Sequence, residues 1–115
     1  MIRPRHNKFG ARLTTVDGIT FHSAAEAKRY GELRLLERAG EISNLELQPK
    51  FPITINGARI STYIADFRYF GCAPNSKRTE VIVEDVKGMK TQLYTLKKKL
   101  VEALYPGTRI VEVRP

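Results

Sequence analysis

Charged residues at the end of an apolar segment are the strongest candidates for chemistry in this sequence. The segment Val81-Ile82-Val83, which is typical of a buried strand, runs directly into Glu84-Asp85-Val86-Lys87. Because alternate residues of a strand share a face, Asp85 and Lys87 are expected to project toward the same side. A carboxylate in this place is costly unless a cation or a metal ion compensates its charge. Taken alone, the acid and the lysine would equally suit an ion pair at the surface.

Two more acids precede this segment in positions where burial is expected. Asp66 lies within residues 60–70, whose alternating pattern predicts one strand, so the aspartate is placed inside a strand and not in a turn. Glu26 belongs to a predicted helix, in line with apolar residues four and seven positions later, and such a stripe faces the core. Glu26 also follows Ser23 by three positions, the spacing of a capping box, which needs no catalytic role. The two roles compete, because a carboxylate turned back to the Ser23 amide is a poorer metal ligand.

A divalent cation would compensate several of these carboxylates together. Carboxylates, backbone carbonyls and water are hard oxygen ligands, which suit Mg²⁺ or Mn²⁺. A structural zinc site has little support, because the chain has one cysteine, Cys72, and two histidines, His6 and His22, without ligand spacing.

A small α/β domain is expected to position these residues. An Asp-Gly pair at 17–18 and an Asn-Gly pair at 56–57, each between β-prone segments, predict tight hairpin turns. The predicted strands are 13–16, 19–21, 42–48, 51–55, 60–70, 79–86 and 109–113, and the predicted helices are 24–39 and 91–105. The order hairpin, α, β, β, β, α, β predicts an α/β fold around a mixed sheet.

The second predicted helix combines an apolar stripe with basic residues. The stripe consists of Leu93, Leu96, Leu100 and Leu104, and we expect it to face the core. The run Lys97-Lys98-Lys99 lies partly off this stripe. These lysines would either contact phosphate groups or form an ordinary solvated helix face.

Composition indicates the class of partner. The chain has 115 residues, enough for one domain, and no apolar run approaches the roughly 20 residues of a membrane span. Twenty Lys and Arg against 12 Asp and Glu give a net charge of +8, which favours nucleic acid over a membrane surface. The lone Cys72 and a basic start without an apolar stretch predict a cytoplasmic protein. We divide the chain into residues 1–12, a basic arm or a merely frayed terminus, and a single domain, 13–115.

Five short motifs follow one another along the chain. They are Ser23-x-x-Glu26-Ala27-x-x-Tyr30, Leu47-Gln48-Pro49, Tyr63-x-Ala65-Asp66-Phe67, Val83-Glu84-Asp85-Val86-Lys87-Gly88 and Thr91-x-x-Tyr94-x-x-Lys97. Together they resemble a phage- and prophage-borne family of unknown function that is placed in the PD-(D/E)XK nuclease superfamily. The resemblance implies a restriction-endonuclease-like αβββαβ core, here with a small N-terminal hairpin. Ala65 stands where the name motif has proline.

The resemblance also implies a metal-dependent DNA endonuclease. The expected ligands of Mg²⁺ or Mn²⁺ are Asp66, Asp85, the Val86 carbonyl and Glu26. Lys87 would be the active-site lysine. Glu84 is an alternative second ligand, but strand parity favours Asp85, because only Asp85 shares a face with Lys87.

Basic side chains outside this site would bind the phosphates of the substrate. The candidates are Arg3, Arg5, Lys8 and Arg12 in the arm and Lys90, Lys97 and Lys98 near the second helix. Phosphate contacts carry little sequence information, so the expected substrate is DNA, branched DNA included, cut with weak sequence selectivity. Cutting two strands would favour a homodimer. A non-catalytic nucleic-acid-binding module, a nuclease subunit that needs a partner and an interaction protein are the alternatives.

Overall fold

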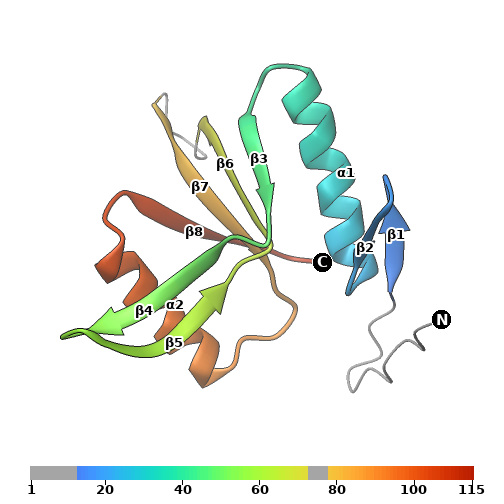
Figure 1. Ribbon diagram of the computed structural model, residues 1–115. Coiled ribbons are helices and arrows are strands. Elements are labelled where there is room, and N and C mark those ends of the chain that lie inside the picture. Colours follow the sequence, from blue (N-terminus) through green and yellow to red (C-terminus); the bar gives the residue numbers. More distant parts are fainter. Residues whose placement is uncertain (1–12, 73–77) are drawn as a thin grey trace.

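The computed structural model describes residues 13–72 and 78–115, and it has an α/β architecture with two helices (Figure 1). The elements are β1 (Thr14–Val16), β2 (Ile19–Phe21), α1 (Ala24–Arg38), β3 (Ser43–Leu47), β4 (Lys50–Ile55), β5 (Ala58–Ile64), β6 (Phe67–Cys72), β7 (Thr79–Val86), α2 (Gln92–Leu104) and β8 (Thr108–Val113). The predicted N-terminal hairpin and both predicted helices are confirmed. The basic arm lies outside the described residues. In the part of the chain that is described, no helix is long and apolar enough to span a membrane.

The central sheet has four strands in the order β3-β6-β7-β8. Neighbouring strands are antiparallel except for β8, which runs parallel to β7. A parallel pair needs a crossover connection, and α2 provides it between β7 and β8. The predicted mixed sheet is therefore confirmed. β4 and β5 pair with each other in a separate two-stranded sheet, which the sequence pattern did not distinguish from the central one.

Hydrophobic cores cover both faces of the central sheet. On one face, α1 and the β1–β2 hairpin enclose a core that includes Leu33 and Phe67. On the other face, α2 and the β4–β5 sheet enclose a core around Ile53, Val83 and Val101. Figure 1 shows the β1–β2 hairpin beyond α1 and the β4–β5 sheet alongside α2. β7 is thus covered on both faces, so that charged residues near its end are buried.

Two predicted hairpin turns are confirmed by their backbone conformation. Asp17 and Gly18 have φ of 53° and 75°, and Asn56 and Gly57 have φ of 50° and 80°. Positive φ at both central residues is typical of the type I′ turn, whose twist matches that of the flanking strands. The first turn closes the β1–β2 hairpin, and the second joins β4 to β5.

The predicted continuous strand 60–70 is wrong. The chain leaves the β4–β5 sheet and enters the central sheet within this segment, so it divides into β5 and β6, with Ala65 and Asp66 between them. The Asp66 N–H still donates to the Glu84 carbonyl at 3.1 Å, so the backbone stays attached to β7. The break also changes the faces to which the side chains point. In a continuous strand Ala65 and Phe67 would share a face, but here they pack in different cores, on opposite sides of the central sheet.

The predicted inward face of the second helix is wrong for three of its four leucines. Tyr94 and Val101 are the buried residues of α2, and Leu100 packs against the same core, whereas Leu93, Leu96 and Leu104 are 61%, 55% and 40% exposed. The Tyr94 ring packs beside Tyr63, with 6.3 Å between ring centroids. α2 packs against β4, β5 and β8. The face that it turns toward them is centred about one residue, or roughly 100° around the helix axis, from the leucine stripe.

Candidate active site

Asp66 lies at the crossing from β5 to β6, where both its backbone and its side chain are attached to neighbouring segments. Its N–H donates to the Glu84 carbonyl at 3.1 Å, and its own carbonyl accepts from the Gln48 N–H at 2.9 Å. Its carboxylate oxygen Oδ2 accepts a hydrogen bond from the Val86 N–H at 2.7 Å. These contacts fix Asp66 beside the end of β7, although it does not belong to a strand.

Asp85 and Lys87 project from the end of β7 toward the same side. Lys87 Nζ lies 3.5 Å from Asp85 Oδ1 and 4.7 Å from the centroid of the Tyr94 ring. The Tyr63 hydroxyl donates a hydrogen bond to Asp85 Oδ2. One oxygen of this buried carboxylate is therefore held by the protein, and the other lies near the lysine.

Glu84 points to the opposite face of β7. Arg29 donates to its carboxylate from Nε and from Nη2, each at 2.7 Å, and the Tyr69 hydroxyl donates to it as well. Glu84 is only 1% exposed, so these partners compensate a fully buried charge. Of the two neighbouring acids, only Asp85 faces Lys87.

Glu26 comes from the first turn of α1 and is half-buried. Its N–H donates to Ser23 Oγ at 3.1 Å, which caps the helix. Within the described residues, no reverse hydrogen bond joins the Ser23 N–H to the Glu26 carboxylate, so the capping box is incomplete. Asp85 and Lys87 are close enough for their charges to change the pKa of Glu26. Its carboxylate is therefore a neighbour of the Asp85–Lys87 pair.

Burial raises the pKa values of all three carboxyl groups. The pKa of Asp66 rises to about 7, because the group is buried and because the charges of Glu26 and Asp85 repel its ionised form. Burial also raises the pKa of Asp85, although hydrogen-bond donors around it oppose the rise. The pKa of Glu26 is raised by burial and by the charge of Asp85. The three acids therefore share an electrostatic cost that a nearby cation would reduce.

These residues fit a hard divalent cation. Asp66 and Asp85 each have one carboxylate oxygen engaged by a hydrogen-bond donor, which orients the other oxygen. Oxygen ligands of this kind suit Mg²⁺ and Mn²⁺. Over residues 13–72 and 78–115, no three His, Cys, Asp or Glu side chains already surround one point as metal ligands. The candidate side-chain ligands are therefore the two aspartates, and further ligands would have to come from backbone oxygens, water or Glu26.

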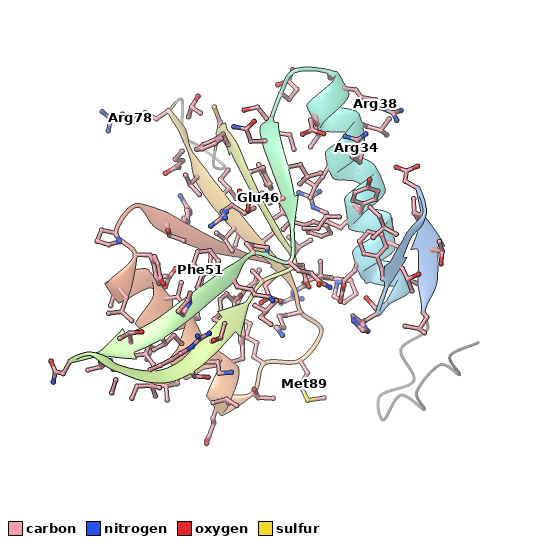
Figure 2. The ribbon with its side chains drawn as sticks, in the orientation of Figure 1. Arg34, Arg38, Glu46, Phe51, Arg78 and Met89 are labelled. Carbon is pink, nitrogen blue, oxygen red and sulfur yellow. The ribbon has the colours of Figure 1, made fainter. Side chains whose placement is uncertain are left out.

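Two surface hollows meet at Lys87. The first, of about 290 Å³, lies between β5 and α2, and its lining includes Thr62, Ile64, Lys87, Leu93 and Lys97. The second, of about 520 Å³, is lined by Lys87, Gly88, Lys90, Glu112, Arg114 and Pro115. Figure 2 shows the Met89 side chain on the loop from β7 to α2, directly after the Lys87-Gly88 step. Lys87 thus borders both hollows.

The predicted phosphate-binding residues differ in their surroundings. The four residues of the arm, Arg3, Arg5, Lys8 and Arg12, lie outside the described residues. Lys90 Nζ is 2.9 Å from a carboxylate oxygen of Glu112, and Lys98 Nζ is 3.7 Å from the same atom. Lys97 Nζ donates to the Thr62 carbonyl at 3.4 Å. Surface contacts of this kind are worth about 0–1 kcal/mol, so a phosphate group can displace them.

Two residues that hold the acids were not identified from the sequence. Tyr63 carried a usable signal, since it precedes Asp66 by three positions within one motif and its pattern predicts an inward-facing aromatic side chain. Arg29 carried none, because 55 positions separate it from Glu84 and nothing local indicates that α1 lies over that face of β7.

Comparison with known proteins places the chain in a family. No curated protein and no solved structure matches it significantly. Residues 6–114 match the family model described as "Protein of unknown function (DUF1064)", and this range includes all the residues of the candidate active site. Because the match spans nearly the whole chain, this protein belongs to the family DUF1064, a family of unknown function.

Proposed function

We propose that the protein is a divalent-metal-dependent DNA endonuclease. The observation that carries this proposal is the meeting of Asp66, Asp85 and Lys87 at the end of β7, where burial raises the pKa of both acids. A surface ion pair would leave its carboxylate in water. Here Asp85 is buried and Asp66 beside it is partly buried, which is costly unless the site binds a cation.

The order of the elements supports the same proposal. α1, β3, β6, β7, α2 and β8 follow one another as α, β, β, β, α, β, and the four strands are neighbours in this order. The resemblance to PD-(D/E)XK nucleases implies a core with this order of elements, and β4 and β5 would then be an insertion. The agreement supports the proposal that the protein is related to the phage- and prophage-borne members of that superfamily.

Asp66 and Asp85 would hold Mg²⁺ or Mn²⁺, with the Val86 carbonyl and Glu26 as further oxygen ligands. The cation, when bound, would supply Lewis-acid activation of the scissile phosphate and lower the pKa of a water molecule. The chain's own contribution is to orient the ligands. The Val86 N–H holds Asp66, and the Tyr63 hydroxyl holds Asp85.

Lys87 is placed to act on the phosphate itself. Its side chain is 32% exposed, and contacts with Asp85 and the Tyr94 ring limit its movement. An ammonium group in this position would donate hydrogen bonds to phosphate oxygens and stabilise the negative charge that develops during hydrolysis. A phosphate can approach it from either of the two hollows that it borders.

The proposed substrate is DNA that is branched or locally distorted, cut with weak sequence selectivity. Lys90, Lys97 and Lys98 lie around the site on its surface, where amines would contact phosphates. Such contacts position the strand and do not read the bases.

Cleavage assays test this proposal. Plasmid, linear and four-way-junction DNA, with an RNA strand for comparison, are incubated with Mg²⁺, Mn²⁺ or EDTA. We expect DNA cleavage with either metal, none in EDTA, and a loss of at least about a hundredfold in Asp85→Asn and in Lys87→Gln. The matched controls Glu46→Gln and Lys28→Gln change exposed residues and should cleave normally.

The outcomes separate the alternatives. Cleavage by Asp85→Asn and Lys87→Gln at the wild-type rate would reject the site. DNA binding without cleavage under any condition would instead support a non-catalytic nucleic-acid-binding module, or a subunit that needs a partner. Circular dichroism of each variant shows whether a loss of cleavage reflects a loss of folding.

A further inference from the structure

The hollow between the ends of β7 and β8 is cationic. Its lining brings Lys87, Lys90 and Arg114 together with one carboxylate side chain, that of Glu112. Lys90 contacts Glu112 at 2.9 Å, and this contact holds the pKa of the Glu112 carboxyl below its ordinary value. Lys87 also faces Asp85 at 3.5 Å, and Lys98 approaches Glu112 at 3.7 Å. Around the hollow, four cations thus meet two carboxylates, and the positive balance attracts an anion.

The hollow between β5 and α2 has a different character. The amines of Lys87 and Lys97 lie on it beside two apolar side chains, Ile64 and Leu93, which are 53% and 61% exposed. Ile64 comes from β5 and Leu93 from the first turn of α2. Such a surface suits a ligand that combines negative charge with an apolar face.

An unpaired nucleotide combines these two properties. In an intact duplex the bases are stacked inside, and the outer surface offers mainly phosphate and sugar. Ile64 and Leu93 would then gain little apolar contact, because the grooves offer only small apolar groups such as the thymine methyl. A base that is not stacked on its neighbours can lie against apolar side chains while its phosphate meets the amines.

We propose that these two hollows together bind a single-stranded segment of nucleic acid that crosses Lys87. Phosphates on one side of the crossing lie against Lys90 and Arg114, and an unpaired nucleotide on the other side lies against Ile64 and Leu93. The inference rests on the proposed function, and it narrows the substrate to strands that are unpaired at the point of cleavage. A protein partner would need acidic side chains beside an apolar face to match both hollows, whereas every unpaired nucleotide carries both a phosphate and a base.

Fluorescence anisotropy of labelled DNA tests this inference. The probes are a single strand of about 15 nucleotides without self-complementarity and the same strand annealed to its full complement. Each is titrated with the full chain in EDTA, so that binding is measured without cleavage. The variants are Leu93→Gln and Arg114→Gln, both at exposed positions. The control is Arg38→Gln, at the end of α1 far from Met89 and the site (Figure 2).

We expect the wild-type protein to bind the single strand more tightly than the duplex. Leu93→Gln should weaken single-strand binding about fivefold, which corresponds to the loss of about 40 Å² of apolar contact, and should leave duplex binding unchanged. Arg114→Gln should weaken binding and reduce its salt dependence. Because the variant makes one phosphate contact fewer, its loss of affinity between about 50 and about 200 mM salt should be about 2.6-fold smaller than that of the wild type.

Other results would overturn the inference. These are equal wild-type affinity for both probes, equal loss for both probes in Leu93→Gln, or a loss in Arg38→Gln as large as that in Arg114→Gln. Calorimetric titration of Mn²⁺ into the protein alone separates this inference from the nuclease proposal. If the protein prefers the single strand but does not bind Mn²⁺, the nuclease proposal is rejected and the inference stands. If it binds Mn²⁺ but has no such preference, the inference is rejected and the nuclease proposal stands.

Discussion

Asp66→Asn replaces a partly buried ionisable side chain with a neutral one of nearly the same shape. In the folded protein, burial and the charges of Glu26 and Asp85 raise the pKa of Asp66 from 3.8 to about 7. The asparagine oxygen can still accept the hydrogen bond that Oδ2 accepts from the Val86 N–H at 2.7 Å. The substitution therefore removes the charge and keeps the hydrogen bond.

The pKa difference determines both the size and the pH dependence of the effect. Between about pH 4 and about pH 7, the folded protein keeps the Asp66 proton while the unfolded chain loses it, so the free energy of unfolding falls as pH rises. A shift from 3.8 to about 7 corresponds to about 4 kcal/mol. Without metal, we expect Asp66→Asn to match the wild type near pH 4 and to be more stable by up to about 4 kcal/mol above pH 7.

Urea denaturation followed by circular dichroism measures this difference, with EDTA present and the pH varied between about 4 and 8. Glu46→Gln is the matched control, because its carboxylate is 52% exposed in a surface pair with Arg68. Its effect should stay within about 0.5 kcal/mol at every pH. Mg²⁺ at tenfold its dissociation constant should then stabilise the wild type by about 1.4 kcal/mol and leave Asp66→Asn unchanged.

Two results would refute this reasoning. If Asp66→Asn were less stable than the wild type at pH 8, or if the difference did not change with pH, the ionised Asp66 would not be costly to bury. Equal stabilisation of both proteins by Mg²⁺ would remove Asp66 from the proposed metal site and leave the argument about burial intact.

Three further substitutions test other parts of the structure. Arg29→Met leaves the buried Glu84 carboxylate without its guanidinium partner and should cost about 3–5 kcal/mol in urea denaturation; a cost below about 1 kcal/mol would contradict the role given to this pair. Tyr63→Phe removes a hydrogen bond that lowers the pKa of Asp85, so more of the Asp85 carboxyl is protonated at low pH. Calorimetry should therefore show a larger loss of Mn²⁺ affinity near pH 6 than near pH 8. Equal losses at the two pH values would argue against this role of Tyr63. Gly57→Val puts a β-branched residue at φ 80° and should cost about 1–2 kcal/mol, with Mn²⁺ affinity unchanged; weaker Mn²⁺ binding would show that the turn is coupled to the site.

Short-range interactions determined most elements of the fold, the strand predicted over 60–70 excepted, and these could be predicted from the sequence. The Asp17-Gly18 and Asn56-Gly57 turns depend on backbone conformations that adjacent residues set by themselves. Asp85 and Lys87 share one side of β7 because side chains alternate along any strand. The residue types proposed for the site were therefore evident from the sequence, as was the side on which two of them lie.

Tertiary packing decided which surfaces meet. The leucine stripe of α2 predicted the wrong inward face, because the space beside Tyr63 accommodates the Tyr94 ring and turns Leu93 outward. Asp66 lies at a break between two strands because the chain passes there from one sheet to another, which no local pattern reveals. Glu84 pairs with Arg29, which lies 55 positions away in the chain, and no local pattern reveals this contact either.

The sequence by itself thus determined the helices, the hairpin turns and most strands, together with the charged residues of the candidate site. Only the tertiary structure decided that Glu26, Asp66 and Asp85 lie within reach of one another's charges, and that burial raises their pKa values. The physical reason is that helix caps, turns and strand alternation depend on neighbours along the chain. Burial and charge repulsion depend on residues that only the packing of distant elements brings together.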